Sequence, residues 1–291
     1  MYEQTLSRGR IHIRLIAIPM GEDLMVSLSG GDAHIGCVTF SVPRPSLLDG
    51  ESPRATTSIF NRTGHKDSEV AEYVSNALCE RLQKHVSVAA GIHVDHITPE
   101  EIEAVRELVG AHVTHLLQAY IVEVDEADQA IRPILKLQGH QEGRLHRAFS
   151  IFIFNSQGRL LLQKRHAEKY HSGGLWSNTC CSHPAWGEQL SDAASRRLME
   201  EMGFHAPIEE LFHFRYKKAF ENGLTENELD HVMIGRYDGP VTFCPEEVED
   251  IRWVEPEALI QDVRQHPERY TYWLLQALPQ VLLYLPHRNA L

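Results

Sequence analysis

Two cysteines and a histidine stand close together in the stretch SNTCCSHP, residues 177–184. Cys180 and Cys181 are adjacent, and His183 follows two positions later. Thiols and an imidazole at this spacing suit a metal site, a reactive thiolate, or simple packing in a core. The stretch alone leaves these three interpretations open, so the choice depends on residues elsewhere in the chain.

A second chemically informative pair lies in the stretch GLTENELDH, where Glu226 and Glu228 are separated by one residue. In a β-strand, residues i and i+2 share a face, so the two carboxylates would point to the same side. Carboxylate oxygens held together in this way suit a divalent cation. The pair therefore predicts a shared metal on a strand.

Composition limits the classes of protein that fit. The 291 residues are 43% hydrophobic and 23% charged, with a net charge of −12, which argues against bulk nucleic-acid binding. No run reaches 18 apolar residues and the first twenty residues lack the features of a secretory signal, so we expect a cytoplasmic protein that does not enter a membrane. Five cysteines without CxxC spacing indicate free thiols.

The elements that would position these residues fall into two domains, at 1–118 and 119–291. The first domain reads as three strands, a long Pro/Ser/Arg-rich loop over 43–65, a helix, a buried strand, and a helix that begins with a capping box at Thr98 and Glu101. The order β-β-β-α-β-α predicts an α+β domain of sheet and helices.

The second domain has strands on both sides of one central helix, which the pattern places over 190–204 and ends at Gly203. A hairpin is expected over 119–137, two strands joined by the turn NSQG over 147–165, three further strands, and a C-terminal helix within 270–285. This arrangement predicts an α/β/α sandwich.

The helix segment RRLMEEMGF, residues 196–204, resembles the tail of the Nudix box, which carries metal-binding carboxylates in a family of diphosphate hydrolases. Glu200, Glu201 and Gly203 occupy matching positions, and Glu188 lies eight residues before Arg196.

Two positions depart from that pattern. Arg197 stands where the box has its first tail glutamate, and Ser182 stands at an upstream glycine position. Replacing a carboxylate by a guanidinium weakens the expectation of a metal-dependent hydrolase, and it adds a cation suited to a diphosphate.

The whole second domain resembles type 1 isopentenyl-diphosphate Δ-isomerase, a family with the Nudix fold. Six separated motifs carry the resemblance in order: KLQGHQEGRLHRAFS, QKRHAEKYHSGGLWSNTCCSHP, RRLMEEMG, FRYKKAF, TENELDH and YWLLQA. The resemblance implies that isopentenyl diphosphate is protonated at C4 and deprotonated at C2 to give dimethylallyl diphosphate. A tertiary carbocation formed on the way needs an aromatic face and the exclusion of water.

The same resemblance implies the site residues. The catalytic set is Cys181 as the C2 base in its thiolate form, Glu228 with Tyr216 for the C4 proton, and Trp273 facing the cation. A divalent metal, Zn²⁺, Mn²⁺ or Mg²⁺, is implied at His140, His146, His183, Glu226 and Glu228. The substrate diphosphate is implied at Lys136, Arg165, Lys169 and Arg197, with a bridging Mg²⁺ held partly by Glu201. Cys180 is expected to pack, and His166 and His171 are expected at the surface.

Three segments of the first domain set glycine beside histidine and aspartate: SGGDAHIGCV, NRTGHKDSEV and GIHVDHITPEEI. A helix N-terminus with Lys66 would suit a phosphate. A metal would instead suit a histidine and aspartate set: His34, His65, His93, His96, Asp32, Asp67 and Asp95. Turn and capping chemistry alone is a third interpretation.

Together with PRPSL, these segments are similar to a family that is associated with gallate-type decarboxylases and is thought to chaperone prenylated flavin, over residues 9 to 112. The similarity implies FMN or prenylated FMN as a ligand, and a prenylated-flavin-dependent decarboxylase or a flavin prenyltransferase as a partner. Prenylated flavin is built from a dimethylallyl phosphate, so one chain would link prenyl supply to cofactor maturation.

Two other functions compete with isomerisation. A Nudix hydrolase would cleave a diphosphate and release phosphate. A non-catalytic chaperone would hold a prenyl phosphate or a flavin without turning it over.

Overall fold

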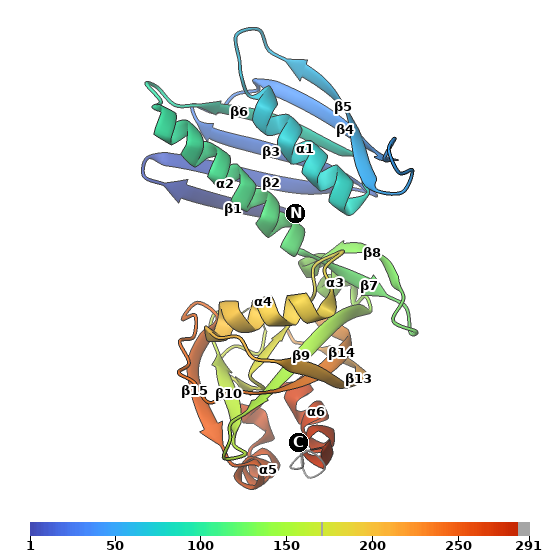
Figure 1. Cartoon of the computed structure of the whole chain (residues 1–291), viewed down its shortest axis with the longest axis vertical. Helices are drawn as coiled ribbons and strands as arrows, with labels where there is room; N and C mark the ends of the chain where they lie inside the picture. Colours follow the sequence, from blue (N-terminus) through green and yellow to red (C-terminus); the bar gives the residue numbers. More distant parts are fainter. Residues whose placement is uncertain (170, 285–291) are drawn as a thin grey trace. The chain divides into compact units, whose positions relative to one another are not determined.

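The computed structural model describes residues 1–169 and 171–284, and it divides the chain into two compact units, Met1–Ala119 and Tyr120–Leu291 (Figure 1). Among the described residues, no helix combines the length and the apolar character that a bilayer span requires.

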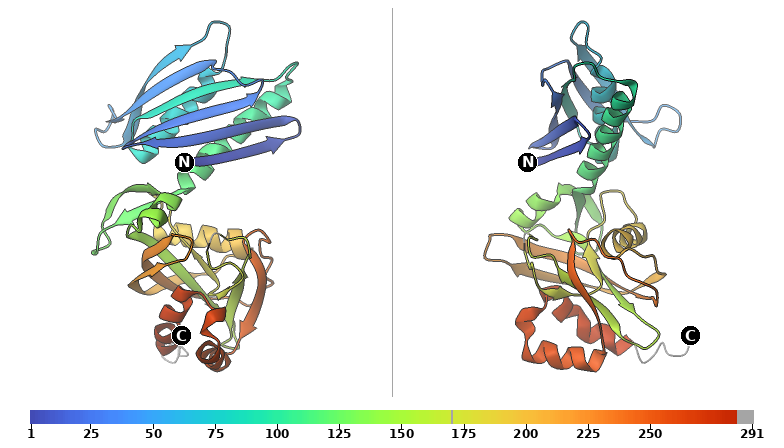
Figure 2. Two further views of the ribbon diagram at one scale, coloured as in Figure 1. Left: turned by 180° about the vertical axis from the view of Figure 1, so that it is seen from behind. Right: turned by 90° about the vertical axis from the view of Figure 1, so that its left-hand side faces the viewer.

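The first unit is one six-stranded sheet with two helices. The strands are β1 Tyr2–Arg8, β2 Ile11–Met20, β3 Asp23–Gly31, β4 Cys37–Pro45, β5 Pro53–Asn61 and β6 Val86–His93, and the helices are α1 Ser68–Leu82 and α2 Pro99–Gln118. The strand order is β1-β2-β3-β6-β4-β5, with β3 and β6 parallel and every other pair antiparallel. Both helices cover one face of this sheet (Figure 2).

Alternation of residue types explains how the sheet is buried. Along β2, Ile11, Ile13 and Leu15 are buried beneath the helices, while His12 and Arg14 between them are exposed. This is the pattern of a sheet with one covered face. The capping box at α2 is confirmed, because the Thr98 side chain accepts from the Glu101 backbone N–H and the Glu101 carboxylate accepts from the Thr98 N–H.

The expected strand order of the first unit is wrong in two respects. β5 lies inside the segment expected to be a loop, and β1 was not anticipated, so the order is β-β-β-β-β-α-β-α. Both are edge strands of the sheet, and most of their side chains are at least partly exposed. An edge strand of this kind needs no apolar alternation, so its sequence resembles that of a loop.

The second unit is a mixed sheet between helices, as expected. Its elements are β7 Tyr120–Val124, β8 Ala130–Leu135, α3 Lys136–Glu142, β9 His146–Phe154, β10 Leu160–Arg165, β11 Trp176–Ser177, β12 Cys180–Ser182, α4 Leu190–Met202, β13 Ile208–Ala219, β14 Thr225–Arg236, β15 Val248–Val254, α5 Pro256–Gln265, a 3-10 turn Pro267–Arg269 and α6 Tyr272–Tyr284. Position 285, the end of the expected C-terminal helix, lies outside the described residues.

Strand β9 separates two apolar clusters. Phe149 and Ile151 face α4, where they pack with Leu198, whereas Phe152 on the other face packs with Leu274 of α6. Figure 1 shows α4 on one side of the strands and α5 and α6 on the other. The two faces make the α/β/α sandwich, and the α6 face also carries the chemistry described next.

Candidate active site

Five side chains gather on the α6 face of the second unit. His140 comes from α3, His146 begins β9, His183 follows β12, and Glu226 and Glu228 alternate along β14. One donor atom from each lies within 4.8 Å of all the others. The spacing of Glu226 and Glu228 predicts that their side chains share one face of a strand, and their positions on β14 confirm this.

Distances within this group, hereafter the five-residue cluster, are short. His140 Nε2 lies 2.9 Å from a Glu226 oxygen, and His183 Nε2 lies 2.9 Å from a Glu228 oxygen. His146 Nε2 lies between the two carboxylates, 3.6 Å from Glu226 and 3.7 Å from Glu228. It is buried and has no hydrogen-bond partner among residues 1–169 and 171–284, which is costly unless another group, such as a cation, uses its lone pair.

The outer nitrogens of two of these imidazoles are held by backbone carbonyls. His140 Nδ1 lies 2.5 Å from the Lys136 carbonyl oxygen, and His146 Nδ1 lies 2.8 Å from that of Arg144. Such contacts fix the ring so that Nδ1 donates and Nε2 is free to coordinate. Three imidazoles, of which His140 and His146 are oriented in this way, and two carboxylates fit a divalent ion such as Zn²⁺ or Mn²⁺.

The two glutamates differ in their affinity for protons. Burial raises the pKa of Glu226, but hydrogen bonds from His140, His146 and His171 outweigh burial and bring the pKa well below its usual value. Burial and the neighbouring charge of Glu226 raise the pKa of Glu228 to about 8. Of the pair, Glu226 is therefore the anion and Glu228 the group that holds a proton.

Aromatic side chains flank this pair. The Tyr216 hydroxyl donates to Glu228 across 2.5 Å, and Tyr216 is buried. Trp273 on α6 is buried as well, and its indole N–H donates to Ser177 at 3.0 Å. The Arg165 guanidinium carbon lies 5.1 Å from the centre of the Trp273 ring, so this ring already accommodates a cation on its face.

Cys181 reaches the same face from β12. It pairs with Ser150 of β9, and Ser150 donates to Asp230 of β14, so all three side chains are on the α6 side. Arg165 Nη1 lies 3.7 Å from the Cys181 sulfur. Burial raises the pKa of the thiol to about 11, and Arg165 only partly opposes this. The neutral thiol is therefore the resting form near pH 7.

Cations collect beside the thiol. Burial lowers the pKa of Lys169 to about 8, and the positive charges of Arg165 and Lys136 add to the effect while Glu201 opposes it. Arg165 is itself buried. Three positive side chains that repel one another in a confined space would be stabilised by an anion such as a diphosphate.

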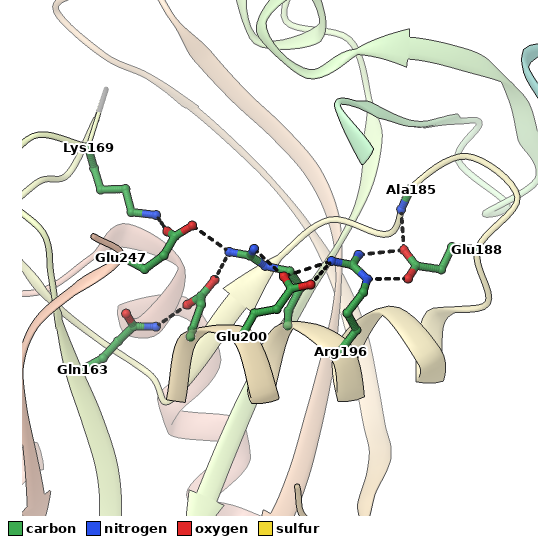
Figure 3. Close-up of polar contacts among 9 residues, drawn as sticks. Gln163, Lys169, Ala185, Glu188, Arg196, Glu200 and Glu247 are labelled. Carbon is green, nitrogen blue, oxygen red and sulfur yellow. Dashed lines mark hydrogen bonds and ion pairs between the residues drawn. The ribbon is translucent and has the colours of Figure 1, made fainter. Parts of the chain in front are cut away.

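A separate ionic network runs along α4 (Figure 3). Arg197 donates to Glu201, to Glu247 and to Glu200, and Glu247 also accepts from Lys169. The buried carboxylate of Glu201 also accepts from Gln163 at 3.1 Å. Burial raises the pKa of Glu201, but Arg197 and Lys169 more than offset this and lower it.

The expected residues therefore form two groups rather than one. Cys181, Tyr216, Glu228 and Trp273 lie with the five-residue cluster on the α6 face. Arg197 and Glu201 belong to α4, on the other face of the sheet, where the buried Cys180 packs among apolar residues. Lys169 links the two groups, because its charge interacts with Glu201 on one side and with Arg165 on the other.

The expectation that His171 lies at the surface is wrong. His171 is buried, its Nε2 lies 2.6 Å from Glu226, and its ring stacks on Phe220 at 4.7 Å. Burial in this pocket lowers its pKa. The polar stretch HSGG around His171 gives no sign of burial, so only three-dimensional contacts place it. His166 is half-buried.

Sequence reasoning also missed three supporting side chains. Gln163 orients Glu201, Glu247 bridges Lys169 and Arg197, and Ser177 contacts Trp273. Of the three, Gln163 and Ser177 carried a signal, because Gln163 opens the motif QKRHAEKYHSGGLWSNTCCSHP and Ser177 opens the stretch SNTCCSHP within it, whereas Glu247 lies in none of the six motifs.

In the first unit, His34, His65 and Asp67 form a second group of potential ligands. The other residues considered there are not part of it: Asp32, His93, Asp95 and His96.

Comparison with known proteins matches both units. Residues 7–121 match the family model of the prenylated flavin chaperone LpdD-like domain, and residues 144–274 match that of the NUDIX domain. The isopentenyl-diphosphate Delta-isomerase 2 of Aromatoleum aromaticum is 48% identical over 166 residues, which is 57% of this chain and 88% of that protein. The chain belongs to the isopentenyl-diphosphate Δ-isomerase family. The isopentenyl-diphosphate Delta-isomerase of Serratia proteamaculans is also 48% identical, over 53% of this chain and 87% of its own.

Membership of the isopentenyl-diphosphate Δ-isomerase family confirms the resemblance seen in the six motifs, and the Nudix match agrees with the type 1 form of that family. The similarity of the first unit to the prenylated flavin chaperone family is confirmed as well. A crystal structure from Deinococcus radiodurans covers 55% of this chain and 97% of its own at 22% identity, with a TM-score of 0.47.

Proposed function

We propose that the second unit converts isopentenyl diphosphate to dimethylallyl diphosphate, with Glu228 delivering a proton to C4 and Cys181 removing one from C2. The observation that carries the proposal is the register around β9. Cys181 lies on one side of this strand through β12, Glu228 lies on the other through β14, and both face α6. A substrate between them would meet an acid and a base from opposite directions.

Protonation states support this division of roles. In the metal-free site Glu228 holds its proton near neutral pH, and it is positioned by the Tyr216 hydroxyl, as a general acid requires. A divalent ion at the five-residue cluster would withdraw electron density from Glu228 and strengthen it as an acid. Arg165 stabilises the thiolate of Cys181, and the Trp273 ring faces positive charge that develops at C3.

Proton balance is maintained through one turnover. The C3=C4 double bond accepts the proton of Glu228, C2 loses a proton to Cys181, and the new double bond lies between C2 and C3. Glu228 ends as the carboxylate and Cys181 as the thiol, so one proton must return from sulfur to carboxylate, directly or through solvent, before the next cycle.

Lys136, Arg165, Lys169 and Arg197 are proposed to hold the diphosphate, with a Mg²⁺ partly on Glu201. The Arg197 network also bears on hydrolysis. Arg197 stands among Glu200, Glu201 and Glu247 and occupies the position of the first glutamate of the Nudix-box tail, so one of the carboxylates that a Nudix hydrolase would use for its metals is absent. Isomerisation is therefore better supported than hydrolysis.

The test is NMR of isopentenyl diphosphate in D₂O with the full chain, Mg²⁺, and Zn²⁺ or Mn²⁺. We expect deuterium in a dimethylallyl product, and a rate loss of about 10²- to 10⁴-fold in Cys181→Ala. Cys180→Ala is the matched control, because it removes the adjacent thiol from the α4 face and should leave the reaction in place. Release of inorganic phosphate would show a hydrolase, and binding of an unchanged substrate would show a non-catalytic holder.

We propose further that the first unit binds FMN or prenylated FMN and serves a prenylated-flavin-dependent decarboxylase or a flavin prenyltransferase. The match of residues 7–121 to the chaperone family supports this, and the product of the second unit would supply the prenyl group. Fluorescence titration of the full chain with reduced FMN and prenylated FMN tests it. Absence of binding to either flavin contradicts the proposal.

A further inference from the structure

A group of three side chains in the first unit has the geometry of a metal site. His34 lies in the loop between β3 and β4, and His65 and Asp67 lie just before α1. His34 Nε2 is 2.9 Å from His65 Nδ1, and each of these nitrogens is 3.5 Å from Asp67 Oδ2. Ligands about 2.1 Å from one ion lie roughly 3.0 Å apart at right angles and roughly 3.4 Å apart at the tetrahedral angle. The three observed separations are close to those values.

Asp67 is oriented toward the histidines and not toward its own helix. It occupies the N-cap position of α1, where an aspartate ordinarily accepts a backbone N–H of the first turn, but its side chain makes no such bond. Instead Oδ1 accepts the backbone N–H of Ile92 at 2.9 Å, and Oδ2 faces the two imidazoles. Capping chemistry therefore does not account for this residue.

His34 is fixed in a ligating orientation. Its Nδ1 lies 3.0 Å from the Asp32 carbonyl oxygen, which can only accept, so Nδ1 carries the proton and Nε2 presents its lone pair to the group. A backbone carbonyl bonded to the outer nitrogen is the usual support of a metal-ligating histidine.

The backbone approaches this group closely at Gly36. A Cβ at this position would lie 1.9 Å from Asp67 Oδ2 and 3.0 Å from His34 Nε2, so no other residue fits there without moving a ligand. The side chain of Asp67 is 7% exposed, whereas those of His34 and His65 are 18% and 27% exposed. The group therefore has a buried anionic end and an end open to solvent.

We propose that His34, His65 and Asp67 bind a divalent transition-metal ion, independently of the five-residue cluster in the second unit. Two imidazoles and one carboxylate select an ion of the Fe²⁺ or Zn²⁺ kind over Mg²⁺ or Ca²⁺. Three protein ligands leave at least one coordination position, and the exposed side of the two rings gives access to it for water or for an anionic oxygen ligand. The site therefore binds a metal that can itself bind a ligand.

The test is a Co²⁺ titration of the untagged, chelator-stripped full chain, followed by visible absorption and elemental analysis. Asp67→Asn is the sharpest variant, because its side-chain oxygen can still accept from Ile92 while the anionic ligand is lost. We expect it to bind one ion fewer than the natural chain, or to bind that ion at least about tenfold more weakly, and His65→Ala to do the same. Isomerase activity should be unchanged in both variants.

Three controls make the result decisive. His93→Ala removes a ring whose centre lies 6.3 Å from that of His34 but which is not part of the proposed site. His213→Ala changes another set of potential metal ligands, which it forms with Glu210 and His231. Both variants should retain the ion. His146→Ala should lose only the ion of the second unit and keep the ion at His34, His65 and Asp67. The proposal for the first unit can therefore be judged separately from the isomerase proposal. Equal ion content in the natural chain and Asp67→Asn, or equal loss in His93→Ala and His65→Ala, overturns the proposal.

Discussion

At the scale of single residues, the protonation of Cys181 is the least expected feature of the second unit. The family resemblance implies a thiolate, but burial holds the resting group as a thiol, with Arg165 at 3.7 Å as the nearby cation that favours ionisation. The thiolate that we propose as the C2 base is thus a minority form, and its population rises with pH and with positive charge at the site.

This gives a prediction for alkylation of the metal-free protein by iodoacetamide. Only the thiolate reacts, so modification of Cys181 should be slow at pH 7 and rise about tenfold per pH unit up to pH 9 without reaching a plateau. Arg165→Gln should slow it further at every pH, because a stabilising cation is removed. Mass spectrometry of the peptide measures the rate, with the half-buried Cys244 as an internal reference. A plateau below pH 8 would contradict the prediction.

Tyr216 offers a second test at this scale. Tyr216→Phe keeps the buried ring but removes the hydroxyl that donates to Glu228. We expect kcat to fall about 10- to 100-fold with little change in KM, since the hydroxyl positions the acid and does not hold the diphosphate. Steady-state kinetics of the full chain measure both constants. A change confined to KM would place Tyr216 in substrate binding instead.

Residue-level prediction from the sequence succeeded where a motif or a spacing carried the information. The spacing of Glu226 and Glu228 was sufficient to predict a shared face. The burial of His171 and the bridging contacts of Glu247 were not accessible, because they depend on loops whose conformation is set by tertiary contacts.

At the scale of elements, an ion pair between Arg196 and Glu188 connects α4 to the loop that precedes it. Arg196 donates through Nε at 2.8 Å and Nη2 at 2.9 Å to the two oxygens of Glu188, which also accepts from the Ala185 N–H (Figure 3). Burial raises the pKa of Glu188, but Arg196 more than offsets this and the pKa is lowered.

A lowered carboxyl pKa stabilises the folded state above the ordinary pKa of glutamate, and this stability is lost as pH falls through the folded-state value. Glu188→Gln should therefore lower the free energy of unfolding by about 1 kcal/mol at pH 7, and the difference from the natural chain should shrink below about pH 4.5. Thermal unfolding across pH 3.5 to 7 measures it. Glu200→Gln is the control, because its side chain is 41% exposed and should change stability little. A difference independent of pH would exclude the ion pair as the cause.

Elements with a covered apolar face were predictable, and those without one were not. β2 and β9 bury apolar side chains on at least one face, whereas β1 and β5 are polar edge strands. β1 and β5 form strands because each pairs with a neighbouring strand, and not because their own residues alternate between apolar and polar.

At the scale of the whole molecule, every residue proposed for the isomerase site lies between 136 and 273, within the second unit. Its two main apolar clusters also contain residues of that unit alone. We therefore expect the chain from 120 onward to fold by itself and to isomerise isopentenyl diphosphate with kcat/KM within about twofold of the full chain. A large loss of activity in the well-folded shorter chain would show that the first unit contributes to the reaction.

Strand β14 pairs with β13 from Thr225 to Gly235 and with β9 from Glu228 to Arg236. One inserted or deleted amino acid within Thr225–Arg236 would exchange the two faces of the strand, so that Asn227 or Leu229 would replace a carboxylate of the five-residue cluster. The turn at 220–224 has no such constraint. Length variation among natural relatives should therefore collect in that turn and be absent from the strand, and an insertion scan scored for isomerase activity would reveal the same boundary.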